Sequence, residues 1–171
     1  MKLIHLIGSE IMKKDDFLKE EDLKEYMLKE IDVIQSIINR MASNSFLIKG
    51  WAITLIVATL LLKGDNYQTL IAFVPLIAFW ILDTFFLQTE RKYRMLNKWV
   101  IKNRLKTDAF LLDMNTERLK KDKDYKTEYK VASIPKIMFS ITLITFYGSI
   151  LLIIIAYVIF IVSMQTGIII F

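Results

Sequence analysis

Residues 44–94 read NSFLIKGWAITLIVATLLLKGDNYQTLIAFVPLIAFWILDTFFLQTERKYR. The stretch contains two apolar runs, residues 46–62 and residues 70–87, separated by a short polar turn. At 17 and 18 residues, each run is close to the roughly 20 residues that a helix needs to cross a ~30 Å hydrocarbon core. The only charged residues inside the runs are Lys49 and Asp83. Because the link is so short, we expect the two helices to form an antiparallel hairpin in a membrane.

The outer ends of this hairpin would meet on one side of the membrane and form a polar foot. The foot consists of Asn44, Lys49, Asp83 and Glu90. An unpaired charge at mid-bilayer costs about 2.5–3.5 kcal/mol on insertion scales, so we expect Asp83 to pair with Lys49, Arg91 or Arg94. A structural role for Asp83 competes with a role in ion coordination or gating, and the sequence leaves both open.

Composition narrows the class of protein. The chain has 171 residues, of which 54% are hydrophobic and 24% charged, and these two classes occupy separate blocks rather than alternating as in a globular core. It has no cysteine, and no motif for a hydrolase, a metalloprotease or a phosphate-binding loop. We therefore expect no enzyme activity, no cofactor and no metal site.

The N-terminal part predicts a long helix from residue 15 onward, with acidic residues in its first turns. Apolar residues recur along it at spacings of three and four and form a narrow seam: Leu23, Met27, Ile31, Ile34, Ile38 and Met41. Such a seam is typical of a helix that packs on another helix, either inside one subunit or between subunits. Nothing in the sequence ends the helix before Gly50, so it can run on into the first span.

Three strings in the middle of the chain resemble a known family. They are NRMASNSFLIKGW at residues 39–51, FWILD at residues 79–83, and ERKYR at residues 90–94. Together they resemble a family of small bacterial membrane-hairpin proteins that includes channel effectors of anti-phage systems of the Hailong type. The resemblance covers roughly residues 35–100. It implies a four-fold channel restrained by a single-stranded oligodeoxyadenylate, made by a partner nucleotidyltransferase, whose opening depolarises the membrane.

A basic helix is predicted over residues 90–106. At 100° per residue, five cations fall within about 120° of one another: Arg91, Arg94, Lys98, Lys102 and Lys106. We call these five residues the basic stripe. The stripe either satisfies the positive-inside bias and touches anionic lipid, or binds a polyanionic nucleotide ligand.

The uncharged run of residues 137–164 predicts a third membrane-spanning helix, introduced by Pro135. Small and hydroxyl-bearing residues share one face of it: Thr142, Thr145, Ser149 and Ala156, with Ser163 beyond them. Such a face either permits close helix packing or lines a narrow aqueous path. The tail of residues 165–171 is too short to form a domain.

The sequence thus predicts an all-α membrane protein with three transmembrane helices and helical cytoplasmic segments. Its expected parts are an N-terminal cytoplasmic helix (residues 1–45), a two-span hairpin (46–88) and a basic cytoplasmic segment (89–136). A third transmembrane helix (137–164) and a short tail (165–171) follow. Residues 88–136 hold fourteen Lys or Arg against seven Asp or Glu. By the positive-inside rule, that segment and the N-terminus lie in the cytoplasm and the C-terminus lies outside the bacterial inner membrane.

Two functions are compatible with this organisation. The first is an oligomeric channel, most simply a homotetramer, that is gated by a nucleotide or oligonucleotide at its cytoplasmic helices. The second is a non-conducting membrane scaffold or partner-binding subunit that uses the same surfaces for protein contacts.

Overall fold

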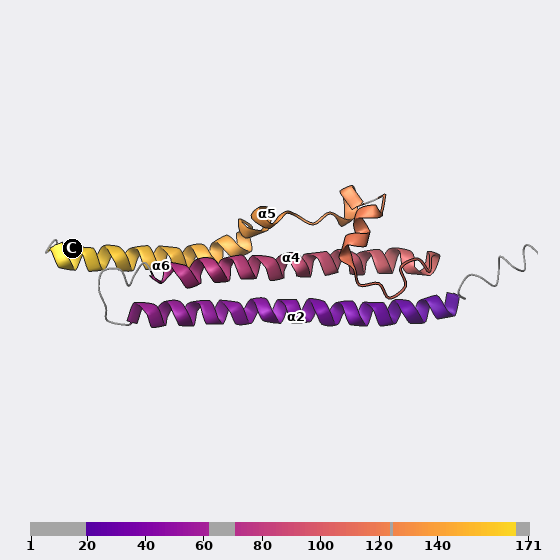
Figure 1. Cartoon of the computed structure of the whole chain (residues 1–171), viewed down its shortest axis with the longest axis horizontal. Coiled ribbons are helices and arrows are strands. Elements are labelled where there is room, and N and C mark those ends of the chain that lie inside the picture. Colours follow the sequence, from indigo (N-terminus) through magenta and orange to yellow (C-terminus); the bar gives the residue numbers. More distant parts are fainter. Residues whose placement is uncertain (1–19, 62–70, 124, 167–171) are drawn as a thin grey trace, which may run out of the picture. The chain divides into compact units, whose positions relative to one another are not determined.

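The structure is a computed structural model, and it describes residues 20–61, 71–123 and 125–166. Across these ranges every regular element is a helix and no strand occurs. The long helices are α2 (Glu20–Leu61), α4 (Phe73–Asn103) and α6 (Ile141–Thr166), labelled in Figure 1. Residues 1–19, the whole of the expected turn at residues 63–69, residue 124 and the tail from residue 167 lie outside the described residues.

Within the part of the chain that the structure describes, three helical segments are long and apolar enough to cross a membrane, as the sequence predicts. They are Glu20–Leu61, Phe73–Lys106 and Thr127–Met164. Large apolar side chains on them are exposed on the single chain, with exposed fractions of 77% for Phe46, 60% for Trp51 and 79% for Ile141. An apolar surface of this extent requires a lipid or protein environment. The chain is therefore an all-helical membrane protein.

Helix α2 is one continuous helix of 42 residues. Its first turn carries Glu20, Glu21 and Asp22, where the helix dipole favours negative charge. The helix passes Gly50 without a break, and a Cβ placed on Gly50 would meet no atom within 4 Å. The expectation that the N-terminal helix continues into the first span is confirmed.

Helix α4 joins the second span to the basic segment in the same way, since it runs without interruption from Phe73 to Asn103. Pro75 is its third residue. A proline costs little there, because the first four N–H groups of a helix have no partner within the helix. Pro75 therefore lies at the start of the helix and does not kink it.

The third span differs from the expected single helix over residues 137–164. A short helix α5 (Ile134–Met138) is followed by a break at Phe139 and Ser140, and α6 begins only at Ile141. The sequence has no helix-breaking residue at this point. Instead, the indole Nε1 of Trp80 donates a hydrogen bond to the carbonyl of Met138 at 3.1 Å, a carbonyl that a continuous helix would use internally.

The chain between α4 and α5 is largely irregular. It contains two short 3-10 helices, η1 (Arg104–Lys106) and η2 (Thr116–Lys121), and a π-helical turn, η3 (Tyr125–Tyr129). Phe110 and Leu112 have positive φ angles of 59° and 55°. Non-glycine residues rarely adopt this conformation, so other contacts must hold the segment in place.

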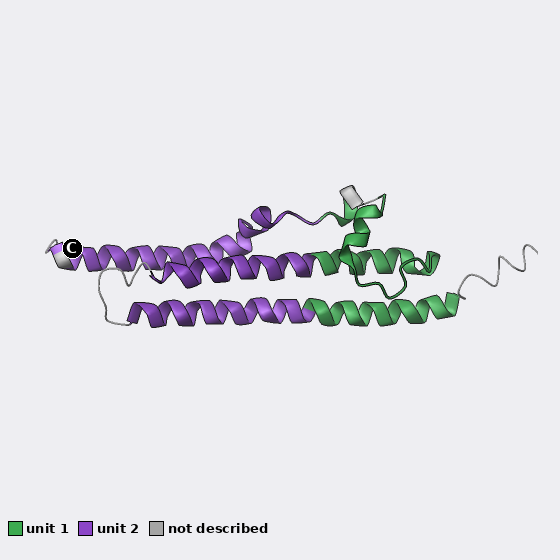
Figure 2. Ribbon diagram, viewed as in Figure 1, with its two compact units in different colours: residues 1–38, 92–130 green, residues 39–91, 131–171 purple. Residues whose placement is uncertain are grey.

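The chain divides into two compact units, coloured in Figure 2. Unit 1 comprises residues 1–38 and 92–130, and unit 2 comprises residues 39–91 and 131–171. Both α2 and α4 continue from one unit into the other, and the third boundary, between residues 130 and 131, lies between η3 and α5.

Each unit has its own apolar core. In unit 1, Ile34 and Ile38 of α2 are buried with Leu96, Trp99 and Val100 of α4, and Leu119 and Tyr129 complete the cluster. In unit 2, Ala52 and Ile56 of α2 are buried with Leu76 of α4 and with Leu143, Tyr147 and Ile154 of α6. Part of the apolar seam, including Ile34 and Ile38, thus packs against other helices of the same chain. For these residues, packing inside one subunit is the role observed.

Candidate functional site

In unit 2, Asp83 is the centre of a buried polar cluster. Its carboxylate is fully buried and lies 2.6 Å from the Nζ atom of Lys49. Ser45 Oγ donates to Asp83 Oδ1 at 2.5 Å, and Tyr147 OH donates to Oδ2 at 3.2 Å. Lys49 also donates to Ser45 Oγ at 2.7 Å. The predicted pairing of Asp83 is confirmed, and Lys49 is its partner.

This cluster differs in membership from the polar foot that the sequence predicts. Asn44 and Glu90 are half-buried and do not belong to the described contacts of Asp83. Ser45 and Tyr147 do belong to them, although the sequence did not single them out. Ser45 lies one helical turn before Lys49, so its place beside the ion pair could be predicted from the sequence. Tyr147 is 64 residues away from Asp83 along the chain, and no local pattern indicates that the two are in contact.

Unit 1 contains a second buried ion pair, between Glu30 and Arg104, and both side chains are fully buried. The pair is bidentate, because Arg104 Nε donates to one carboxylate oxygen at 2.8 Å and Nη2 to the other at 2.8 Å. The sequence analysis assigned no role to either residue. Glu30 lies between Met27 and Ile34 on the seam face of α2, and an acidic residue among apolar ones requires a partner.

Arg104 also holds the irregular segment that follows α4. Its Nη1 donates to the carbonyls of Thr107 and Ala109, and its Nη2 donates to the carbonyl of Phe110. The backbone N–H of Leu112 donates to Glu30 Oε1 at 2.6 Å. These contacts surround the two positive-φ residues and stabilise their unusual conformation.

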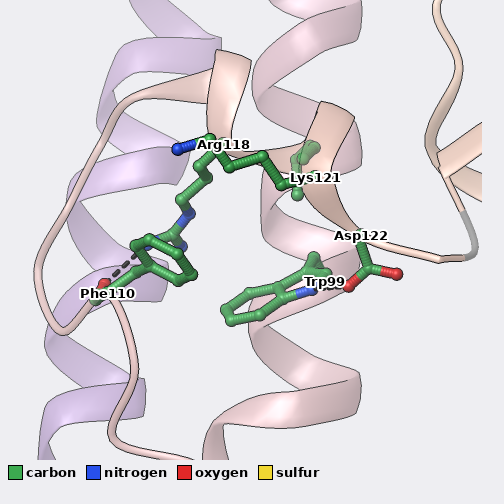
Figure 3. A pocket seen from close by; sticks show the side chains of 6 residues that line it. Trp99, Phe110, Arg118, Lys121 and Asp122 are labelled. Carbon is green, nitrogen blue, oxygen red and sulfur yellow. Dashed lines mark hydrogen bonds between the residues drawn. The ribbon is translucent and has the colours of Figure 1, made fainter.

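A small pocket of about 150 Å³ lies beside this segment in unit 1. Its walls are Trp99, Phe110, Arg118, Leu119, Lys121 and Asp122. Figure 3 shows the Phe110 ring against the guanidinium end of Arg118, and the indole nitrogen of Trp99 directed at Asp122. That nitrogen donates to Asp122 Oδ2 at 2.7 Å. The sequence did not predict this pocket.

The basic stripe is exposed along most of its length. Arg94, Lys98, Lys102 and Lys106 are exposed, whereas Arg91, which belongs to unit 2, is half-buried. Two of these cations are near Glu128, at 3.3 Å for Lys98 and 2.6 Å for Lys102. Their ammonium groups lower the pKa of Glu128, so its carboxylate stays ionised and offsets part of the positive charge.

The small-residue face of α6 points away from the core of its own unit. Thr142, Thr145, Ser149 and Ala156 are all exposed, and the buried face of the helix instead carries Leu143, Tyr147 and Ile154. Close packing against α2 or α4 of the same chain therefore does not account for the small residues. Packing between copies of the chain and lining of an aqueous path both stay open.

The chain matches no family model, no curated protein and no solved structure.

Among the described residues, no group of three or more His, Cys, Asp or Glu side chains is placed to hold a metal ion. The chemistry available in these residues is that of buried ion pairs, exposed cations and a small aromatic pocket. These features can bind anions and can link the positions of helices.

Proposed function

We propose that this protein is an oligomeric channel of the bacterial inner membrane, gated by a nucleotide or oligonucleotide ligand and acting in anti-phage defence. Opening of the channel would depolarise the membrane. The defence role, the four-fold assembly and a partner nucleotidyltransferase rest on the family resemblance described above.

In the proposed topology the first two spans form a hairpin, the basic segment lies in the cytoplasm and the C-terminus lies outside. The net charge of +7 over residues 88–136 supports this orientation through the positive-inside rule. A cytoplasmic basic segment is also where a ligand made in the cell would bind.

The observation that carries the channel proposal is the exposed hydroxyl face of α6. An uncharged helix that crosses a membrane has no need for Thr142, Thr145 and Ser149 on a face that its own chain leaves uncovered. Three spans from one chain are too few to enclose an aqueous path. Copies arranged around a symmetry axis would bring these faces together, and hydroxyl groups tolerate water where Leu and Ile do not.

The long helices supply a route from ligand to pore. With 42 residues, α2 extends over about 63 Å at 1.5 Å per residue, roughly twice the ~30 Å hydrocarbon core. A ligand that binds one arrangement of the cytoplasmic parts more tightly than another shifts the population of that arrangement. A helix without a break can transmit this shift into the membrane.

The test is ion flux through liposomes that contain the purified protein, together with membrane potential in cells after induced expression. We expect Ser149→Phe to reduce flux at least tenfold, because the ring would occupy the shared path. The matched control is Ile155→Phe, which alters an exposed residue about 120° away on the same helix. Absence of flux from the wild-type protein, with or without oligodeoxyadenylate, would contradict the channel and favour the non-conducting scaffold.

A further inference from the structure

The pocket beside Trp99 contains an arginine whose hydrogen-bonding capacity is only partly used. Arg118 has an exposed fraction of 6%. Its Nη1 donates to the carbonyl of Phe110 at 2.5 Å, whereas the buried Nε and Nη2 atoms have no hydrogen-bond partner. Buried donors without acceptors are rare in folded proteins, and those on a charged group are especially costly.

The electrostatics of Arg118 agree with this geometry. Burial lowers the pKa of Arg118, and the charges of Asp113 and Glu30 offset only part of that effect. The guanidinium carbon lies 4.7 Å from the Trp99 ring centroid and 5.6 Å from that of Phe110. The two rings hold the side chain in place but provide no acceptor oxygen.

The neighbouring buried arginine indicates what the unused edge can bind. Arg104 uses its own Nε and Nη2 atoms to hold both oxygens of the Glu30 carboxylate. In Arg118 the same two nitrogens form the unpartnered edge. This edge of a guanidinium matches two oxygens of a carboxylate or a phosphate.

We propose that this pocket binds a single phosphate group, with Arg118 Nε and Nη2 as donors and Lys121 as a second cation. Two cations line the pocket against one acid, Asp122, whose Oδ2 accepts from Trp99 Nε1. A volume of about 150 Å³ is roughly half of the smallest typical small-molecule site of ~300 Å³. The pocket therefore accommodates one phosphate rather than a whole nucleotide.

Phe110 forms the outer wall through which the ligand enters. Its side chain is 48% exposed, and its backbone carbonyl already contacts Arg118 and Arg104. Rotation of the exposed ring would uncover the two unpartnered nitrogens without breaking these backbone contacts. The phosphate is either soluble or part of an anionic phospholipid headgroup.

This inference goes beyond the proposed channel, since none of the pocket residues belongs to the basic stripe and binding does not require conduction. The test uses the full-length protein in nanodiscs of phosphatidylcholine, in phosphate-free buffer, with radiolabelled inorganic phosphate at constant ionic strength. We expect saturable binding that Arg118→Met weakens by about 10- to 100-fold, as loss of hydrogen bonds from a charged group predicts. The control is Lys123→Gln, an exposed cation nearby that does not line the pocket, and it should bind within twofold of the wild type.

Lys121→Gln provides a second variant, because Lys121 is exposed and its loss should leave folding intact. It should weaken phosphate binding several-fold. Nanodiscs that contain phosphatidic acid distinguish the two sources. If the pocket binds a lipid headgroup, phosphatidic acid will compete with inorganic phosphate and abolish its binding to the wild type. If the pocket binds a soluble phosphate, the binding of inorganic phosphate will be unchanged. The proposal is overturned if inorganic phosphate shows no saturable binding and phosphatidic acid has no Arg118-dependent effect on thermal stability. Equal phosphate binding by the wild type and Lys121→Gln would also overturn it.

Discussion

Among the residues that the structure describes, a buried ion pair occurs in each unit, and the two pairs are built differently. In unit 1, Glu30 and Arg104 are both fully buried, and their remaining donors and acceptors contact the backbone of residues 107–112. In unit 2, Asp83 is fully buried while the Lys49 side chain stays 23% exposed, and the remaining contacts are made by the hydroxyls of Ser45 and Tyr147.

The difference shows what each pair stabilises. The Glu30–Arg104 pair holds the backbone of an irregular segment, together with Arg118, which donates to the carbonyl of Phe110. The Lys49–Asp83 pair joins side chains from α2, α4 and α6, so it fixes which faces of these helices meet. Removal of a partner should therefore be more damaging in unit 1, where both members of the pair are fully buried, than in unit 2, where the lysine is partly exposed.

The largest expected effect is that of Arg104→Met. It leaves Glu30 buried without a cation and removes the donors to three backbone carbonyls, so we expect a loss of about 3–5 kcal/mol in the free energy of unfolding. Hydrogen exchange in residues 92–123 would measure the loss. Lys106→Met, which alters an exposed cation nearby, should have almost no effect.

A double variant sharpens this prediction. Glu30→Leu combined with Arg104→Met should regain part of the lost stability, because apolar residues of similar volume often replace a buried ion pair without cost. If Arg104→Met alone is as stable as Lys106→Met, the pair does not support the segment in the way we infer.

An intermediate effect is expected in unit 2, and the two partners of its ion pair should differ. Lys49→Met strands a fully buried carboxylate that retains only the hydroxyls of Ser45 and Tyr147, so we expect a loss of about 2–3 kcal/mol. Asp83→Leu leaves a lysine that can turn its ammonium group to water and should cost about 1 kcal/mol less. Thermal unfolding in nanodiscs would rank the two variants.

The same variants separate a structural role from gating. Reduced thermal stability with normal flux per folded channel would assign the pair to structure. Unchanged stability of Asp83→Leu together with altered conductance would assign Asp83 to gating and contradict the structural interpretation.

The smallest effect on stability is expected for the basic stripe. Lys98→Gln with Lys102→Gln removes two exposed ion pairs to Glu128, and such pairs contribute at most about 1 kcal/mol. If the stripe binds a single-stranded oligonucleotide, the same variant should bind it more weakly, and the dependence of affinity on salt should become shallower by about 0.7 units per lost phosphate contact. Fluorescence anisotropy at two salt concentrations would measure both quantities.

A variant with the opposite expected effect on oligonucleotide binding serves as a control. Glu128→Gln removes the carboxylate that competes with ligand phosphates for Lys98 and Lys102, so it should tighten oligonucleotide binding at low salt. Absence of salt-sensitive binding in the wild type would remove the stripe as a nucleotide site and leave contact with lipid as its role.

Several features of this protein follow from the sequence by itself. Three segments long and apolar enough to cross a membrane, the continuity of the N-terminal helix into the first of them and the need of Asp83 for a charged partner were predictable. The physical reason is that these properties are local: hydrophobic length, the absence of helix breakers and the cost of a lone charge in lipid do not depend on distant residues.

Other features were decided only by the tertiary structure. Glu30 and Arg104 are 74 residues apart and Trp80 and Met138 are 58 apart, so their contacts depend on which helix faces pack together. The break before α6 is one consequence, because the indole of Trp80 donates to the carbonyl of Met138, which a continuous helix would use for its own hydrogen bond. The pocket of Trp99, Phe110 and Arg118 is another, because it exists only where the irregular segment folds back beside α4.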